Sequence, residues 1–264
     1  MRPVETSWPT AAENLAAEDA LLEARDAAGR PEAGDGTASP AVEPLASDVF
    51  RVWESARPAV VVGRSGRLER EVYADECRRL GVPVLRRSTG GGTIVAGPGC
   101  LMYAVVLSTR DRPGLAQVDV AHRVVLDRVR AALATVGLTA EQRGSSDLTL
   151  AGEAADDDRG PARKFSGNAM RVGRRSILYH GTILYGFDLD LIGRLIPPPP
   201  KEPDYRGGRG HERFVRNAPL DRASLVAALR AEFVTDARPV TVPALALERW
   251  LAERYANPAW HARH

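Results

Sequence analysis

Residues 85–95 read Leu85-Arg86-Arg87-Ser88-Thr89-Gly90-Gly91-Gly92-Thr93-Ile94-Val95, a stretch in which two arginines precede three glycines and an apolar, strand-like segment follows. Glycine costs backbone entropy inside a regular element, so three together indicate a close approach of the backbone to another group. The guanidinium groups suit a carboxylate or a phosphate. The spacing matches neither a Walker loop nor Gly-x-Gly-x-x-Gly. Taken alone, the three glycines favour a flexible loop between strands.

A second region changes this interpretation. Residues 163–171 read RKFSGNAMR and residues 177–185 read ILYHGTILY, and the tight connection through Gly173 predicts that they form a hairpin. As a strand, the first segment alternates between two faces. One face carries Lys164, Ser166, Asn168 and Met170, and the other carries Phe165, Gly167 and Ala169. A lysine beside small polar residues and a glycine suits a carboxylate or a developing oxyanion.

Each candidate also has a structural interpretation. Lys164 alone is more often a solvated strand lysine, and His180 alone is more often a buried histidine with satisfied hydrogen bonds. The motifs gain weight from their combination and order along the chain.

Together these stretches resemble the lipoate-protein ligase family, which is related to biotin ligases and octanoyltransferases. The resemblance runs from Glu13 to Asn217 and rests on six segments in the family's order. They are a first helix (13–22), an apolar strand with a Gly-Arg corner (58–64), Arg-Arg-x-Ser/Thr-Gly-Gly-Gly (86–93), Asp147-Leu148, the lysine strand (163–169) and His-Gly-Thr-x-Leu (180–184).

The resemblance implies the fold of the biotin/lipoate protein ligase catalytic domain. We therefore expect the α+β class, with a mixed, largely antiparallel β-sheet flanked by helices. Residues 1–12 are expected to form a flexible N-terminus, and residues 13–217 the catalytic domain. Residues 26–48, rich in Ala, Gly, Pro and Glu, are expected to be a flexible insertion, and residues 218–264 a short helical tail.

The resemblance also implies the chemistry. Such an enzyme joins lipoate or octanoate to a lysine of a lipoyl carrier domain, using ATP and Mg²⁺ and passing through an acyl-AMP. Lys164 matches the catalytic lysine, and Asp147 is a candidate to orient the amine or hold the metal. The expected substrate- and adenylate-binding residues are Arg87, Thr89, Gly90, Gly91, Gly92, Thr93, Asp147, Ser166, Gly167, Ala169, His180, Gly181 and Thr182.

The basic loop at residues 201–217 leaves two interpretations open. Its residues Arg206, Arg209 and His211 could form a flap that closes over phosphates, or they could lie on a solvated surface loop.

Three departures from the family pattern shape the functional alternatives. Ala96 stands where many ligases have a histidine, and Ser146 stands in place of the usual asparagine before Asp147. The 47 residues after Asn217 are too few for the accessory domain of larger ligases. We therefore expect either a separate accessory subunit or an acyltransferase that uses preformed lipoyl-AMP or octanoyl groups.

Two rival functions are disfavoured by residue content. A cysteine-dependent transferase needs a thiolate, and no cysteine lies between Leu101 and His264. A non-catalytic protein that binds lipoate or its carrier would not need the charged groups that are present, although a fold alone never proves activity.

Composition narrows the protein class. The 36 basic and 34 acidic residues give a formal net charge of +2, which offers no strong field for nucleic acid or for a membrane surface. No apolar window is long enough to cross a bilayer, and no signal-peptide core is present. Cys77 and Cys100 lack the spacing of a disulfide or metal pair, so we expect a cytoplasmic protein with no nucleic-acid or membrane partner.

Overall fold

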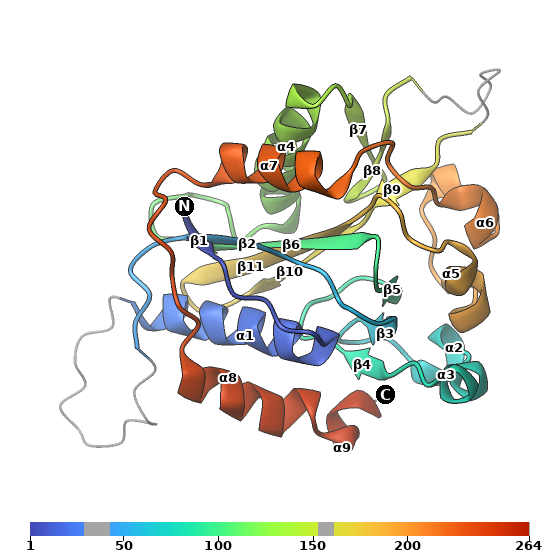
Figure 1. Ribbon diagram of the computed structural model, residues 1–264, viewed down its shortest axis with the longest axis horizontal. Coiled ribbons are helices and arrows are strands. Elements are labelled where there is room, and N and C mark those ends of the chain that lie inside the picture. The colour runs from blue at the N-terminus through green and yellow to red at the C-terminus, as the bar shows by residue number, and fades with distance from the viewer. Residues whose placement is uncertain (29–42, 153–160, 264) are drawn as a thin grey trace.

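The computed structural model describes residues 1–28, 43–152 and 161–263, and Figure 1 shows a central sheet between two helical layers. The sheet has five strands in the order β1-β2-β6-β11-β10, and all neighbours except β1 and β2 are antiparallel. The strands are β1 (Arg2–Val4), β2 (Val49–Trp53), β6 (Cys100–Ser108), β11 (Ser176–Leu184) and β10 (Asn168–Val172).

Two three-stranded sheets complete the β-structure. The order β4-β3-β5 contains one parallel and one antiparallel pair, and the order β7-β8-β9 is antiparallel. Their strands are β3 (Ala59–Val62), β4 (Val84–Arg86), β5 (Ile94–Ala96), β7 (Ala140–Arg143), β8 (Asp147–Leu150) and β9 (Lys164–Ser166). The largely antiparallel α+β architecture expected from the sequence is confirmed.

Strand β6 explains why the molecule has two apolar cores. Its alternate residues Met102, Ala104 and Val106 belong to the core under α1 (Ala11–Ala27). Its other residues, Leu101, Tyr103, Val105 and Leu107, belong to the core under α4 (Val118–Thr135) and α7 (Arg222–Phe233). A strand buried on both faces needs a continuous apolar sequence, which β6 has.

The two main helices begin and end at identifiable signals. Thr10 and Glu13 form a capping box at the start of α1, each side chain satisfying a free backbone N–H of the other. Helix α4 buries Ala121, Val125 and Val129 at four-residue steps, and Gly137 follows it with φ +80°.

The shorter helices surround the cavity described below and close the outer layers. Residues 68–80 form two helices, separated at Val72 and Tyr73. The shorter elements are α2 (Leu68–Glu71), α3 (Ala74–Leu80), α5 (Asp190–Leu195), η1 (Asp204–Arg206), α6 (His211–Phe214), α8 (Ala244–Trp250), η2 (Leu251–Tyr255) and α9 (Pro258–His261).

The prediction of a loose N-terminus at residues 1–12 is wrong. Arg2, Pro3 and Val4 pair with β2, and Val4 is buried. Three residues are too few to show a period, so only the neighbouring strand reveals this one. Of the insertion predicted at 26–48, residues 29–42 lie outside the described residues, while Asp26 and Ala27 belong to α1 and Leu45 is buried.

The segment predicted as a helical tail covers both layers of the molecule. Helix α7 packs against α4, and its Phe233 stacks on Phe50 of β2 with ring centroids 5.0 Å apart. Helix α8 packs against α1 on the other side of the sheet (Figure 1). In α9, Trp260 Nε1 donates to Arg86 O, and His261 Nδ1 accepts from Arg86 N. These contacts cover the open edge of β4.

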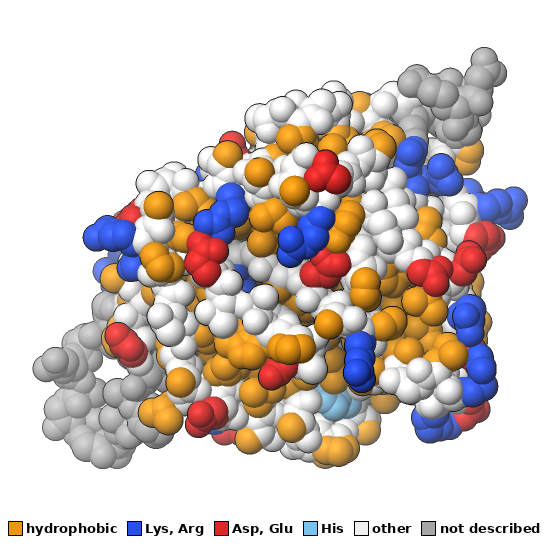
Figure 2. All heavy atoms as spheres, viewed as in Figure 1, with side chains coloured by type: hydrophobic (Ala, Val, Ile, Leu, Met, Phe, Trp, Pro, Cys, Tyr) orange, Lys and Arg blue, Asp and Glu red, His pale blue; other side chains and the backbone are white. Residues whose placement is uncertain are grey.

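The surface carries both signs of charge. In Figure 2, Lys and Arg side chains alternate with Asp and Glu along the edge that carries α2, α3 and α6. Among the described residues, no helix is both long and apolar enough to span a membrane.

Candidate active site

A cavity of about 370 Å³ lies between the glycine loop, β5, α5 and the ends of β8 to β11. The predicted site residues that line it are Arg87, Gly91, Gly92, Thr93, Asp147, Lys164, Gly167, Ala169, His180, Gly181, Thr182, Arg206 and His211. Thr89, Gly90, Ser166 and Arg209 were also predicted but are not on its wall. Sequence segments far apart in the chain therefore meet at one hollow.

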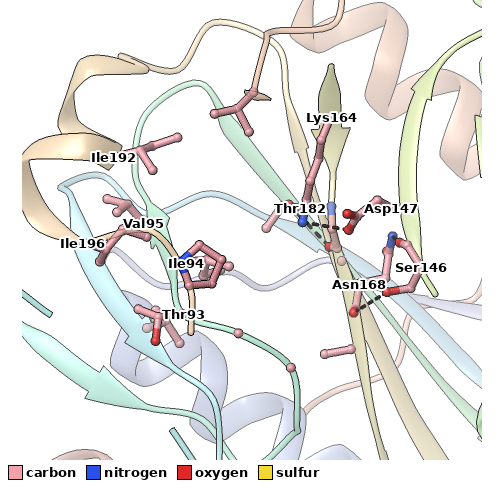
Figure 3. Close-up of a pocket in the computed structure, with 18 of the residues that line it drawn as sticks. Thr93, Ile94, Val95, Ser146, Asp147, Lys164, Asn168, Thr182, Ile192 and Ile196 are labelled. Carbon is pink, nitrogen blue, oxygen red and sulfur yellow. Dashed lines mark hydrogen bonds and ion pairs between the residues drawn. The ribbon is translucent and has the colours of Figure 1, made fainter. Parts of the chain in front are cut away.

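The cavity has one apolar and one polar side. Figure 3 shows Ile94, Val95, Ile192 and Ile196, from β5 and the α5 region, on one side of the space. Lys164, Asp147, Thr182, Ser146 and Asn168, from β8 to β11 and the turn before β8, lie on the other side. Ligand cavities commonly combine apolar walls with a few placed polar groups, and the volume lies within their usual range.

Lys164 is the cation of the polar side. Its Nζ lies 2.7 Å from Asp147 Oδ1, and the Lys164 and Asp147 side chains are 27% and 14% exposed. The other carboxylate oxygen of Asp147 accepts a hydrogen bond of 2.9 Å from Tyr205 Oη. Burial and the neighbouring carboxylate raise the pKa of Tyr205, so the phenol keeps its proton and remains a donor. Tyr205 thus positions Asp147, and Asp147 positions the Lys164 ammonium, while part of the lysine side chain stays accessible.

Gly167 divides the predicted lysine strand in two. β9 belongs to the small sheet with β8, whereas β10 belongs to the central sheet. A Cβ at residue 167 would lie 2.7 Å from Lys164 Nζ, so a side chain here would displace the ammonium. The prediction of one continuous strand is therefore wrong. The chain passes from the small sheet to the central sheet at Gly167, beside which the Lys164 ammonium lies.

Arg87 does not present a free guanidinium to the cavity. It is only 4% exposed, and its Nε donates to Thr89 Oγ1 at 2.9 Å. Its Nη1 donates to Val61 O, and its Nη2 donates to the carbonyl oxygens of Gly90 and Gly92. Burial lowers the pKa of Arg87 to about 10, which still leaves it charged near neutrality. These contacts support a role for Arg87 in shaping the loop, and binding of phosphate by Arg87 stays a prediction.

The loop that Arg87 holds presents backbone N–H groups. Gly91 and Gly92 are exposed on the cavity wall, and no described group accepts from either amide. Gly91 has φ +81°, and a Cβ there would lie 2.9 Å from Arg87 Nη2. At Gly63 a Cβ would lie 1.9 Å from Gly91 O. Both glycines are required by close packing of backbone and guanidinium, and the free amides can donate hydrogen bonds to an anion.

His180 is a buried connecting residue. Its Nδ1 lies 2.6 Å from Glu18 Oε2, and its Nε2 lies 2.8 Å from Thr89 Oγ1. Burial by itself raises the pKa of Glu18, but His180, Arg51 and Trp53 outweigh it and leave the pKa lowered, so this carboxylate is ionised. His180 forms part of the wall, yet both of its ring nitrogens are engaged away from the cavity.

The predicted flap residues fasten their own segment. Arg206 is buried, donates from Nε to Arg209 O, and lies 4.6 Å from the Phe214 ring centroid. Arg209 donates to the carbonyl oxygens of Tyr205, Arg206 and Ala162. His211 Nε2 lies 3.0 Å from Pro197 O. Arg209 is occupied with backbone groups, whereas Nη2 of the buried Arg206 on the cavity wall has no hydrogen-bond partner among the described residues, so a flap over phosphates stays a prediction for Arg206.

Neither cysteine suits covalent catalysis. Both are buried, and burial raises the pKa of Cys100, on the cavity wall, to about 12. Such a thiol is protonated at neutral pH and a poor nucleophile.

The described residues provide no preformed metal centre. No group of three or more His, Cys, Asp or Glu side chains is arranged to hold an ion. Asp147 already binds Lys164 and Tyr205. It fits at most as a single carboxylate ligand beside a phosphate, which is the usual manner of Mg²⁺ binding at nucleotides.

Sequence reasoning missed four residues. Lys201 lines the cavity, Glu71 accepts a hydrogen bond from Thr93 Oγ1 at 2.7 Å, and Tyr205 and Glu18 support the residues above. Glu18 carried a signal, an acidic residue within an Ala- and Leu-rich helix. Ala96, one departure from the family pattern, is fully buried and not on the cavity wall.

Comparison with known sequences supports these observations. A sequence model of the family described as "Lipoyl protein ligase A/B catalytic domain" matches residues 10–218. The "Putative lipoate-protein ligase A" of Aeropyrum pernix is 29% identical over 150 residues, and the "Probable lipoate-protein ligase A" of Mycoplasma pneumoniae is 26% identical over 148 residues. These regions cover 57% and 56% of this chain but only 51% and 39% of the relatives.

Solved structures share the fold over nearly the whole chain. One is the bipartite lipoate protein ligase of Thermoplasma acidophilum, from a study that includes its E2 lipoyl domain (TM-score 0.77, 20% identity, 99% of this chain and 95% of that one). Another is a lipoate-protein ligase A bound with ATP (TM-score 0.74, 21% identity, 99% and 98%). A third is a T. acidophilum protein with bound lipoic acid (TM-score 0.73, 21% identity, 99% and 98%).

At these identities the structural likeness shows the fold, and the sequence match shows the family. The lipoate-ligase catalytic-domain fold expected from the motifs is confirmed. The chain belongs to the lipoyl protein ligase A/B catalytic-domain family.

Proposed function

We propose that this chain activates lipoate or octanoate with ATP and transfers the acyl group to a lysine of a lipoyl carrier domain. The observation that carries the proposal is the arrangement of the cavity. Lys164 faces a space whose opposite side is apolar. Gly91 and Gly92 also line this cavity, and among the described residues their backbone amides have no acceptor. A fatty acid with an anionic head matches this division.

The acyl chain lies against the apolar side, formed by Ile94, Val95, Ile192 and Ile196. Its carboxylate meets Lys164, which exchanges its contact with Asp147 for the substrate. Burying a medium-length hydrocarbon stabilises the complex by about 0.8 kcal/mol per CH₂ group.

In the first step a carboxylate oxygen attacks the α-phosphorus of ATP. The bond to the bridging oxygen of the β-phosphate breaks, and acyl-AMP and pyrophosphate form. Two anions must approach each other, so the step requires positive groups fixed in advance. Lys164 supplies one, the amides of Gly91 and Gly92 supply partial charges, and Lys201 is a second cation on the wall.

In the second step the carrier lysine attacks the acyl carbon, and the bond to the phosphate oxygen breaks, releasing AMP. A free lysine has a pKa of about 10.4 and must lose a proton before it attacks. Lys164 stays charged to stabilise the developing oxyanion. Asp147, released from Lys164, attracts the incoming ammonium group and orients it.

Mg²⁺, when bound with the nucleotide, neutralises phosphate charge. Asp147 is the carboxylate beside Lys164 that would hold the ion, in the usual manner of Mg²⁺ bound with a nucleotide.

The carrier and accessory partners are proposed by likeness. The T. acidophilum relative is described as bipartite and was studied with an E2 lipoyl domain. We propose a lipoyl domain as acceptor here, and a separate accessory subunit that assists adenylation.

Intact mass measurement of an apo carrier domain tests the proposal. The carrier is mixed with this protein, lipoate, ATP and Mg²⁺, and a gain of one lipoyl group supports the ligase reaction. A parallel reaction supplies lipoyl-AMP in place of lipoate and ATP. A gain only in that reaction identifies the alternative, a transferase that relies on another protein for adenylation. No gain in either, with binding of lipoate or carrier retained, would leave the non-catalytic binding protein.

A further inference from the structure

A buried row of polar side chains lies behind the glycine loop. It begins at Glu18 in α1, which is 1% exposed. Glu18 Oε1 accepts a hydrogen bond of 2.7 Å from Trp53 Nε1, and Oε2 lies 2.6 Å from His180 Nδ1. Glu18 is absent from the cavity wall, so it cannot touch a substrate there.

The row continues from His180 to the loop itself. His180 Nε2 lies 2.8 Å from Thr89 Oγ1. The same hydroxyl oxygen accepts a hydrogen bond of 2.9 Å from Arg87 Nε. The same guanidinium holds the carbonyl oxygens of Gly90 and Gly92. All four side chains are at most 4% exposed, so water does not compete for these bonds.

The chemistry of the row fixes the direction of each hydrogen bond. An ionised carboxylate only accepts, so Nδ1 of His180 carries a proton toward Glu18. With Nδ1 donating to Glu18, Nε2 can accept the hydroxyl hydrogen of Thr89. The hydroxyl oxygen keeps its lone pairs for the N–H of Arg87. The charge of Glu18 thus selects the histidine tautomer and, through it, the orientation of Thr89.

We propose that Glu18 is a positioning residue for adenylation, acting through His180, Thr89 and Arg87 on the peptide planes of Gly90 to Gly92. Its effect on the reaction rests on the proposed function, whereas its effect on the loop does not. The carbonyl of Gly90 is turned onto Arg87, and the N–H of Gly91 lies in the same peptide plane on the opposite side, so this contact leaves the Gly91 amide available to the nucleotide.

A glutamine at position 18 would break the row with little change in shape. The carboxylate accepts from two donors, Trp53 and His180, but an amide offers only one oxygen. Its NH₂ group would face the second donor, so His180 must switch tautomer or lose the bond. The neighbouring Asp19 still accepts from Ser88 Oγ at 2.6 Å, which keeps the loop attached to α1.

Glu23 offers a matched control on the same helix. Its Oε2 accepts a hydrogen bond of 2.8 Å from Trp250 Nε1 and also pairs with Arg249. Glu23 therefore has a carboxylate–indole hydrogen bond of the same kind as that between Glu18 and Trp53. Its hydrogen bonds and ion pair among the described residues lead to Trp250 and Arg249 and not to the loop at residues 88–93. Trp53→Phe offers a milder change, since it removes the indole donor and leaves the carboxylate in place.

The experiment compares wild-type protein with Glu18→Gln, Trp53→Phe and Glu23→Gln. Hydrogen exchange followed by mass spectrometry reports on the peptide that covers residues 88–93. Lipoate-dependent exchange of pyrophosphate into ATP reports kcat and KM. For Glu18→Gln we expect about tenfold faster exchange of the loop amides and a kcat lower by about 10- to 100-fold, the range expected for a misplacement of about 1 Å.

The kinetic constants separate positioning from general destabilisation. The apolar side that holds the acyl chain does not depend on the row, so the KM for lipoate should stay within about threefold. Trp53→Phe should change both readouts in the same direction by a smaller factor, and Glu23→Gln should match wild type. Trp53→Phe decides the matter if Glu18→Gln does not fold.

Unchanged exchange at residues 88–93 in a folded Glu18→Gln protein would overturn the proposal. Equal losses in Glu18→Gln and Glu23→Gln would overturn it as well, because they indicate general destabilisation of α1. If wild-type protein forms no adenylate, the chain does not carry out adenylation by itself, and the hydrogen-exchange result still decides whether Glu18 positions the loop.

Discussion

Arg87 and Lys164 are two cations on one cavity wall, and their surroundings differ. Arg87 is buried, and its guanidinium donates hydrogen bonds to four oxygen atoms of the protein. Lys164 is partly exposed and has one carboxylate partner. A buried guanidinium with saturated hydrogen bonds shapes the backbone, whereas an accessible ammonium can change partners. Two cations that look equivalent in the sequence motif therefore have different expected roles.

Replacement of Lys164 should give the largest loss of activity. Loss of one preplaced charge typically costs about 10²–10³ in rate, and we expect at least this for Lys164→Ala in adenylation. The melting temperature should change little, since the side chain is partly exposed. Thermal unfolding and pyrophosphate exchange measure the two quantities. Lys201→Ala provides the comparison, with a loss below about tenfold, and a large fall in the melting temperature of Lys164→Ala would make Lys164 structural.

Arg87→Lys should show the opposite pattern. A lysine cannot reach the carbonyl oxygens of Val61, Gly90 and Gly92 together, so buried acceptors lose their donors. We expect the free energy of unfolding to fall by about 2–4 kcal/mol, measured by urea denaturation. A protein of normal stability that is inactive would instead indicate that Arg87 acts directly on the substrate.

Tyr205→Phe tests the support behind Lys164. Removal of the phenol leaves Asp147 Oδ2 without its 2.9 Å donor, and the carboxylate becomes free to rotate away from Lys164. A hydrogen bond of this kind contributes about 1 kcal/mol, so we expect activity to fall by about three- to tenfold. The measurement is kcat for carrier modification at saturating lipoate. Full activity in this variant would show that Lys164 does not depend on Tyr205.

The smallest expected effect is a dependence of stability on pH. Burial lowers the pKa of His261, and Arg86 lowers it further, against an opposing hydrogen bond to Tyr255 O. Its Nδ1 accepts from Arg86 N at 2.9 Å and cannot do so when protonated. The unfolded chain therefore takes up a proton first, so stability is full above pH 6.5 and is lost as pH falls below it.

The midpoint of thermal unfolding should thus decrease by a few degrees between pH 7.5 and pH 5.5. His261→Gln should reduce this slope, because an amide can accept from Arg86 N and donate to Tyr255 O at any pH. Burial also lowers the pKa of His122 and His211, so some slope should remain. An identical slope in the variant would exclude His261 as a source.

The sequence predicts the fold well where a pattern is long. The order of the motifs, through the family resemblance that it supports, indicates the antiparallel α+β fold, and the apolar run of β6 and the stripe of α4 are recognisable because burial along a long element leaves a pattern. The three residues of β1 leave none. The strand change at Gly167 is also invisible, since alternation continues through it in the sequence while the backbone changes sheets.

The candidate site is predictable as a set of residues and less so as a set of roles. Motif order brings Lys164, Asp147 and the glycines together, as the cavity shows. It does not reveal that Arg87, Arg206 and Arg209 satisfy backbone carbonyl oxygens, because hydrogen-bond partners distant in sequence decide that. The composition also points to the site. Only two of the 36 basic residues are lysines, Lys164 and Lys201, and both line the cavity.

The division of the C-terminal helices between the two layers has a practical consequence for anyone who expresses this protein. A fragment trimmed to the family boundaries, residues 10–218, would lose β1, α7 and α8 at once. Phe50 would lose its stacking partner on one face, and α1 would lose its cover on the other. Newly exposed apolar surface of this kind favours aggregation, so recombinant work should retain residues 1–9 and 219–263.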